Sequence, residues 1–155
     1  MSNKKYIIVK DKDKLHRVSE KVDCEDIKSL VDISYSLLKA YDDLDGKCQG
    51  ISAIQIDIPV RAFLIRWPKV EEPTILFNPT VLLKIGKKKS IEGCLSENGD
   101  LYVLNRPRLV LARFYEYNVG YTYRLLTYKR ARIFMHEYDH LSGILISDKG
   151  KKLGV

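Results

Sequence analysis

The segment His136-Glu137-Tyr138-Asp139-His140 places two imidazoles and one carboxylate at a spacing that can bind a metal ion. Residues four apart lie on one face of an α-helix, so His136 and His140 can direct two nitrogens at the same ion. A divalent ion lowers the pKa of a bound water, and Glu137 is then placed to move that water's proton. This spacing favours a metal-dependent hydrolase.

A catalytic metal site of this kind needs a third protein ligand, and Cys94 is the strongest candidate. The sequence has only three histidines and three cysteines, so two histidines at ligand spacing are not readily accidental. For Cys24 and Cys48 we expect small buried thiols. Cys94 differs because it follows Gly93, and a glycine lets the backbone approach a ligand closely.

Three short motifs, in their order along the chain, resemble those of the peptide deformylase family. One motif is intact and reads Glu92-Gly93-Cys94-Leu95-Ser96. Another has methionine in place of the leading glutamine and runs from Met135 to His140. The remaining motif runs from Cys48 to Gln55 and matches the family at Gly50, Ile51, Ala53 and Gln55. It carries Cys48 where the family has glycine and Ser52 where it has alanine.

The resemblance implies that Cys94, His136 and His140 hold one divalent metal ion, with Cys94 bound as the thiolate. The expected ion is Fe²⁺ in cells, and Zn²⁺, Ni²⁺ or Co²⁺ are expected to replace it. Water would attack the formyl carbonyl of an N-formylmethionyl peptide, releasing formate and a free amine. Glu137 would move the proton.

The resemblance also implies oxyanion donors and substrate contacts. The side-chain amide of Gln55 and the backbone N–H of Leu95 would stabilise the negative oxygen. Gly50 and Ile51 would pair with the peptide as an added strand, and Gly93 would lie beside it. We expect an apolar pocket for the methionine side chain, lined by Ile51 and Ile133. Cys48 would narrow this pocket.

Two charged residues are expected to support the metal site. Arg106 would pair with Glu92 and hold the Glu92–Ser96 segment in place, as the family arrangement suggests. Asp139 would orient a ligand or the metal-binding helix. The alternative for both charges is a solvated position at the surface.

Length and composition predict one domain over residues 1–155. No apolar run approaches the roughly 20 residues of a membrane span, and no signal peptide is expected at the start. We expect a monomer that is located in the cytoplasm, which is the cytoplasm of the host cell if the protein is phage-encoded. The net charge is +7, but we expect solvated lysines and no specific nucleic acid, with a hairpin tip at residues 84–89 and a mobile tail at 149–152.

The predicted elements form an α+β fold, with antiparallel strands wrapped around a central metal-binding helix. A helix capped by Asp23 is expected over residues 24–41, and the metal helix is expected between Thr127 and Gly143. Strands are expected, with prolines separating the first three, at 61–65, 74–77, 81–83, 109–115 and 121–123. The last two would form a hairpin around residues 118–120.

Two departures from the family pattern bear on substrate binding and on contact with the ribosome. Glu97-Asn98-Gly99 follow Ser96 where the family has an apolar residue and a proline, which predicts a more polar loop beside the substrate groove. The sequence ends soon after Gly143, so we expect a short, phage-type form without the further C-terminal helix of bacterial members. Ribosome contact therefore stays open.

Two other functions compete with deformylation. A metallopeptidase of the same fold would use the same metal ligands. A non-enzymatic basic protein that binds RNA or ribosomes would explain the net charge. Gln55, Cys94 and Glu137 argue against this binding module, because it has no need of them.

Overall fold

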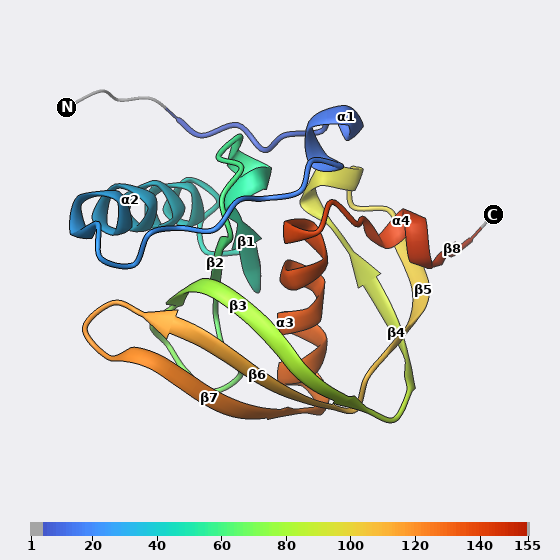
Figure 1. The fold of residues 1–155 in the computed structure, drawn as a ribbon. Helices are drawn as coiled ribbons and strands as arrows, with labels where there is room; N and C mark the ends of the chain where they lie inside the picture. Colours follow the sequence, from blue (N-terminus) through green and yellow to red (C-terminus); the bar gives the residue numbers. More distant parts are fainter. Residues whose placement is uncertain (1–4, 155) are drawn as a thin grey trace.

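The computed structural model describes residues 5–154, and its elements form two antiparallel sheets with a helix between them (Figure 1). The helices are α1 (Lys12–Leu15), α2 (Ile27–Asp43), α3 (Tyr128–Leu141) and α4 (Ile146–Lys149), with 3-10 turns η1 (Ala53–Ile56) and η2 (Leu95–Glu97). The strands are β1 (Gly50–Ser52), β2 (Ala62–Ile65), β3 (Thr74–Ile85), β4 (Lys88–Gly93), β5 (Leu101–Arg106), β6 (Leu109–Glu116), β7 (Gly120–Thr127) and β8 (Lys151–Lys152).

The α+β architecture expected from the sequence is confirmed. Five strands form one sheet in the order β1-β2-β3-β6-β7, and three form another in the order β4-β5-β8. Helix α3 stands between the two sheets, with β1 and β2 on one side and β4 and β5 on the other (Figure 1). Among the described residues, no helix has the length and apolar character that crossing a membrane requires.

Helix α3 is fixed by its apolar face against the five-stranded sheet. Phe134 is fully buried, and its ring lies 5.5 Å from Phe63 of β2 in an edge-to-face arrangement and 6.2 Å from Phe114 of β6. Met135, which replaces the family's glutamine, belongs to the same core cluster. Burial of such large side chains gives roughly 1.5–3 kcal/mol each, so this face holds the metal helix in position.

The strands expected at 74–77 and 81–83 are one strand, and the prediction that proline separates them was wrong. β3 passes through Pro79, where its pairing with β6 shifts register between Phe77 and Thr80. The preceding residue, Asn78, has a φ of 47°. A β-bulge tolerates proline because the ladder hydrogen bond is already lost there.

Helix α2 begins at Ile27 and ends at Asp43, later at both ends than predicted. Its cap is Asp26, whose carboxylate accepts the Ser29 N–H at 3.2 Å. The predicted cap, Asp23, instead accepts the Glu25 N–H in the turn before the helix. Three acidic residues near one helix start compete for the capping role, and sequence alone does not rank them.

Both lysine-rich segments lie in regular structure that differs from the prediction. Residues 84–89 do contain a turn at Gly86, but it leads from β3 in one sheet to β4 in the other, so it is not a hairpin tip. Residues 149–152 do not form a loose tail, because Lys151 and Lys152 pair with Val103 and Tyr102 of β5.

Both ends of α3 lie near the predicted residues. Thr127 is at the N-cap position but makes no side-chain capping bond. Gly143 follows the helix with a φ of 70°, and a Cβ there would lie 2.3 Å from the carbonyl oxygen of His16. Only glycine fits this position, so the residues after α1 pack directly on the end of the metal helix.

Candidate active site

Cys94, His136 and His140 bring three potential metal-binding atoms together. These atoms all lie within 4.8 Å of one another, and Cys94 Sγ lies 3.4 Å from His140 Nε2. Tetrahedral coordination at ordinary bond lengths separates a sulfur and a nitrogen ligand by about 3.5 Å. The arrangement therefore fits one transition-metal ion, with β4 leading to the thiol and α3 supplying both imidazoles.

The surroundings of the two imidazoles shift their pKa values in opposite directions. Burial holds the pKa of His140 well below its usual value, so its nitrogen lone pair is available. Burial opposes the charge on His136 too, but contacts with Cys94 and Glu92 raise its pKa to about 10. Metal binding would therefore displace a proton from His136, because only the neutral imidazole is a ligand.

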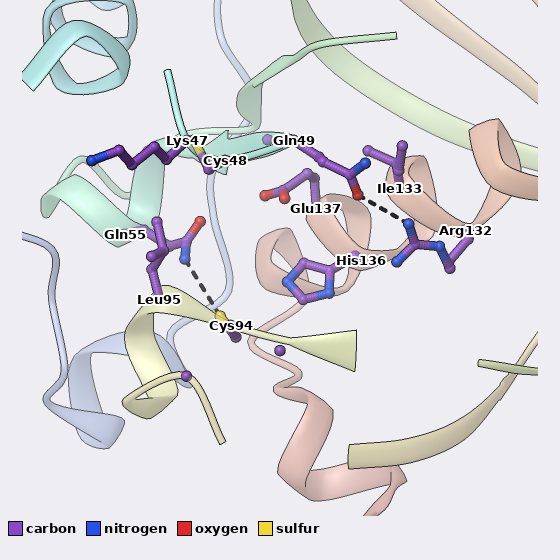
Figure 2. Close-up of a pocket in the computed structure, with 13 residues that line it drawn as sticks. Lys47, Cys48, Gln49, Gln55, Cys94, Leu95, Arg132, Ile133, His136 and Glu137 are labelled. Carbon is purple, nitrogen blue, oxygen red and sulfur yellow. Dashed lines mark hydrogen bonds between the residues drawn. The ribbon is translucent and has the colours of Figure 1, made fainter. Parts of the chain in front are cut away.

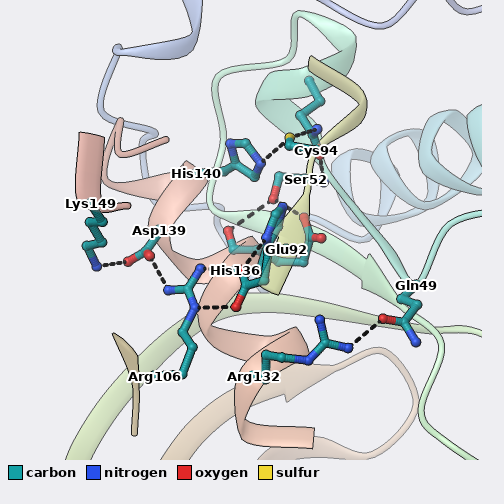
Figure 3. Close-up of polar contacts among 12 residues, drawn as sticks. Gln49, Ser52, Glu92, Cys94, Arg106, Arg132, His136, Asp139, His140 and Lys149 are labelled. Atoms are coloured by element: carbon teal, nitrogen blue, oxygen red, sulfur yellow. Dashed lines mark hydrogen bonds and ion pairs between the residues drawn. The ribbon is translucent and has the colours of Figure 1, made fainter. Parts of the chain in front are cut away.

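A buried network of charged groups orients His136 from behind (Figure 3). His136 Nδ1 lies 2.9 Å from Glu92 Oε2, which directs the other ring nitrogen towards the cysteine. Arg106 donates two hydrogen bonds to Glu92 at 2.9 and 2.8 Å and another to Asp139. Lys149 contacts the second Asp139 oxygen at 2.8 Å.

This network confirms the predicted pair between Arg106 and Glu92 and gives Asp139 a role. Burial disfavours the charge on Glu92, but Arg106 and His136 outweigh it and hold the pKa of the carboxyl well below its usual range. Asp139 contacts no metal-binding atom and acts on the site through Arg106. Neither Arg106 nor Asp139 is a solvated surface charge, since they are 3% and 6% exposed.

Gln55 presents its amide nitrogen to the metal-binding cysteine. Its Oε1 accepts the backbone N–H of Ser52 at 3.0 Å, which fixes the orientation of the amide. Its Nε2 then lies 3.6 Å from Cys94 Sγ (Figure 2). The same nitrogen lies 3.0 Å from Ser96 Oγ. An N–H donor is therefore held beside the place where a substrate oxygen would approach the metal.

Glu137 is enclosed on two sides by the first and last residues of β1. The hydroxyl of Ser52 lies 2.8 Å from Glu137 Oε2 and 3.0 Å from the backbone oxygen of the same residue. A Cβ at Gly50 would lie 2.6 Å from Glu137 Oε1, so only glycine permits this approach. Burial raises the pKa of Glu137, which suits a group that takes and returns a proton.

A cavity of about 260 Å³ joins these groups. Figure 2 shows Glu137, His136 and Gln55 around it, with Arg132 bonded to Gln49 along one wall at 2.9 Å. The apolar side chains in its lining are Cys48, Leu95 and Ile133. The expectation of an apolar pocket is met only on that part of the wall, because polar side chains, among them Lys47, Gln49 and Arg132, line much of the rest.

The predicted substrate contacts separate into two groups. Gly50, Gly93 and Ile133 line the cavity, whereas Ile51 does not, since its side chain is fully buried in the core beside α2. Leu95 lines the cavity as the first residue of η2, a position whose N–H has no partner within the turn. Cys48 is half-buried there, and burial raises the pKa of its thiol to about 11.

The polypeptide deformylase family model matches residues 4–154. A peptide deformylase of Clostridium botulinum is 34% identical over 88% of this chain and 87% of its own length. Peptide deformylase 2 of Shewanella oneidensis is 32% identical over 70% of this chain and 65% of its own length. A Plasmodium falciparum peptide deformylase superposes with a TM-score of 0.83 at 32% identity, covering 94% of this chain and 86% of that one.

The chain belongs to the polypeptide deformylase family. As a member of that family it is a hydrolase that removes the N-formyl group from nascent peptides. The cysteine and two histidines indicate a metal ion. Sequence reasoning missed Gln49 and Arg132 as cavity residues. It also missed the contact between Ser52 and Glu137, although Ser52 stood out as a departure from the family motif.

Proposed function

We propose that this protein hydrolyses N-formylmethionyl peptides with one metal ion held by Cys94, His136 and His140. The three donor atoms lie within 4.8 Å of one another, and Cys94 and His136 line one cavity together with Glu137 and Gln55. This convergence carries the proposal. We propose Fe²⁺ as the ion in cells, with Zn²⁺, Ni²⁺ or Co²⁺ as replacements, since one thiolate and two imidazoles suit all four. When bound, the ion would polarise the formyl oxygen and make water a better nucleophile.

Glu137 is the proposed proton carrier. Its carboxylate removes a proton from the attacking water as the water oxygen bonds to the formyl carbon. It then delivers this proton to the amide nitrogen as the carbon–nitrogen bond breaks, leaving formate and a free amine. Ser52 and the backbone of Gly50 hold the carboxylate at the cavity wall through both steps.

Gln55 and Leu95 are the proposed oxyanion donors. The negative charge that develops on the formyl oxygen is stabilised by the Gln55 amide and by the free N–H of Leu95. Because Ser52 fixes the Gln55 amide, no reorientation is needed during the reaction.

Gly50 and Gly93 are the proposed contacts for the peptide backbone, on opposite sides of the cavity. Ile133 is the proposed contact for the methionine side chain, since it lies one turn before His136 on α3. We further propose a single-domain monomer that acts in the cytoplasm on newly made chains. Docking on the ribosome is not needed for this chemistry.

Formate release from formyl-Met-Ala-Ser by protein loaded anaerobically with Fe²⁺ or Ni²⁺ tests the function. Glu137→Ala should keep the metal but lose roughly 100- to 10,000-fold in kcat, the usual contribution of a general acid–base. Glu71→Ala, at an exposed position, is the matched control and should retain activity.

Acetylated and unblocked versions of the same peptide separate this function from its nearest alternative. A deformylase releases neither acetate nor internal fragments at a comparable rate, whereas a metallopeptidase cleaves the unblocked peptide. Absence of formate from metal-loaded protein would contradict the proposal.

A further inference from the structure

A second hollow, of about 230 Å³, lies beside the catalytic cavity and is strongly basic. It is formed by the start of β4, the turn between β5 and β6, and the first turns of α3 (Figure 1). Five cationic side chains line it and no carboxylate does. These side chains are Lys88, Lys89, Arg108, Lys129 and Arg132.

None of these five cations has a carboxylate partner within 4.0 Å among residues 5–154, although ten ion pairs occur elsewhere in that range. Arg132 bonds only to the neutral Gln49 amide, and Lys88 lies over the Tyr128 ring at 5.9 Å. Like charges gathered in one hollow repel each other, and an anionic ligand would relieve that repulsion.

The hollow and the catalytic cavity share a wall. Arg132 lines both, and it lies one helical turn before His136 on α3. On the opposite side, β4 runs from Lys88 at the hollow to Gly93 at the cavity. A peptide with its formyl end at the metal site can therefore extend between the same two elements into the hollow.

The distance between the two sites sets which peptide residues would reach the hollow. Lys129 and His136 are two turns apart on α3, which is about 10 Å at 1.5 Å per residue. An extended peptide advances about 3.3 Å per residue. The third to fifth residues of the substrate would then lie at the basic side chains.

We propose that this hollow is a subsite for acidic side chains at the third to fifth positions of the peptide substrate. The proposal rests on the deformylase function above and adds a charge preference to it. An occupant the size of one or two carboxylate side chains fits the volume. A nucleic-acid strand would instead need a longer basic track, and the proposed function already places a peptide substrate in the adjoining cavity.

The test compares formyl-Met-Ala peptides in which one aspartate replaces serine at position two, three, four or five. At low salt we expect kcat/KM to rise about fivefold for aspartate at positions three to five, mainly through KM, and to change little at position two. The preference should fall below twofold in 0.5 M NaCl, because exposed charges are screened.

Two charge-reversal variants distinguish a local subsite from a general electrostatic attraction between the basic protein and an acidic peptide. The double variant Lys88→Glu/Lys129→Glu should abolish the aspartate preference and leave turnover of the all-serine peptide unchanged. Lys21→Glu/Lys28→Glu changes the net charge equally at exposed positions outside the hollow, and it should retain the preference.

Equal kcat/KM for acidic and neutral peptides would overturn the proposal, as would equal loss of the preference in both double variants. RNA binding that depends on Lys88 and Lys129, without any peptide preference, would assign the hollow to nucleic acid instead. Turnover of the all-serine peptide measures deformylation independently of the hollow. If only the subsite proposal is wrong, this peptide is still deformylated; if the proposed function is wrong, it is not.

Discussion

The two sheets contribute to the same active site but are held together by different forces. Around the five-stranded sheet, two large apolar clusters pack against α2 and α3, with Phe63, Phe77 and Phe134 fully buried. Around the three-stranded sheet, the buried apolar cluster contains only Cys94, Leu104 and Ile146. This sheet is joined to α3 instead by the buried charges of Glu92, Arg106 and Asp139.

The two kinds of contact have different effects: apolar packing supplies stability, and the charged network fixes the positions of the site residues. Apolar packing is strong but not directional, so it fixes α3 on the large sheet without fixing the rotation of an imidazole. Charge-assisted hydrogen bonds are directional, and they hold the cysteine-bearing segment and His136 in one geometry. Such a buried ion network adds little net stability, but it is costly to break.

Removal of Arg106 should have the largest effect. Arg106→Ala leaves buried Glu92 with only His136 as a partner and Asp139 with only Lys149, so we expect a loss of about 4 kcal/mol in the free energy of unfolding. Metal affinity should also fall, by roughly 10- to 100-fold, because Glu92 is no longer fixed by Arg106 and orients His136 less firmly. Chemical denaturation and metal titration measure the two effects.

Lys152→Ala is the control for Arg106, since it breaks an exposed ion pair with Asp100 on the same sheet. This variant should match the wild-type protein in both measurements. Normal metal affinity in Arg106→Ala would show that the network has no positioning role.

Truncation on the apolar side should lower stability alone. Phe134→Ala removes a ring packed against Phe63 and Phe114, and we expect a loss of about 3 kcal/mol in the free energy of unfolding. Metal affinity at low temperature should stay near the wild-type value, because the charged network is untouched. If metal affinity fell as much as in Arg106→Ala, the apolar packing would also position the site residues, and the two sheets would not differ in this respect.

We expect the smallest effect from a change at Ser52, the β1 residue whose hydroxyl contacts Glu137 of α3. Ser52→Ala restores the residue usual in the family but removes the hydroxyl that holds Glu137, so kcat should fall about tenfold with little change in KM. Metal content should stay the same. Ser19→Ala, which removes another buried hydroxyl away from the cavity, serves as the control. Wild-type kcat in Ser52→Ala would leave Gly50 alone to position the carboxylate.

Much of the fold and the grouping of Cys94, His136 and His140 could be predicted from the sequence because local patterns carry them. The spacing of His136 and His140 predicts a helix, and the intact motif around Cys94 pointed to the third member of the group. The path of β3 through Pro79 could not be predicted, since a bulge depends on the partner strand. Buried Glu97 was expected in a polar loop, and nothing in its neighbours indicated burial.

The cavity wall was also beyond sequence reasoning. Gln49 and Arg132 are far apart in the chain, and their hydrogen bond follows from how β1 and α3 pack. A lysine-rich run looks the same in a sequence whether it is solvated or gathered into a hollow. The clustering of Lys88 and Lys129 became visible only once β4 and α3 lay side by side.

The contact between His16 and Gly143 has a consequence for synthesis of the protein itself. It joins a segment near the beginning of the chain to one near its end, and the metal-binding residues come from distant segments as well. Contacts so distant in sequence form slowly and late in folding. A partly translated chain that ends before α3 therefore lacks this group of residues, and the enzyme becomes able to process other new proteins only after its own α3 has been made.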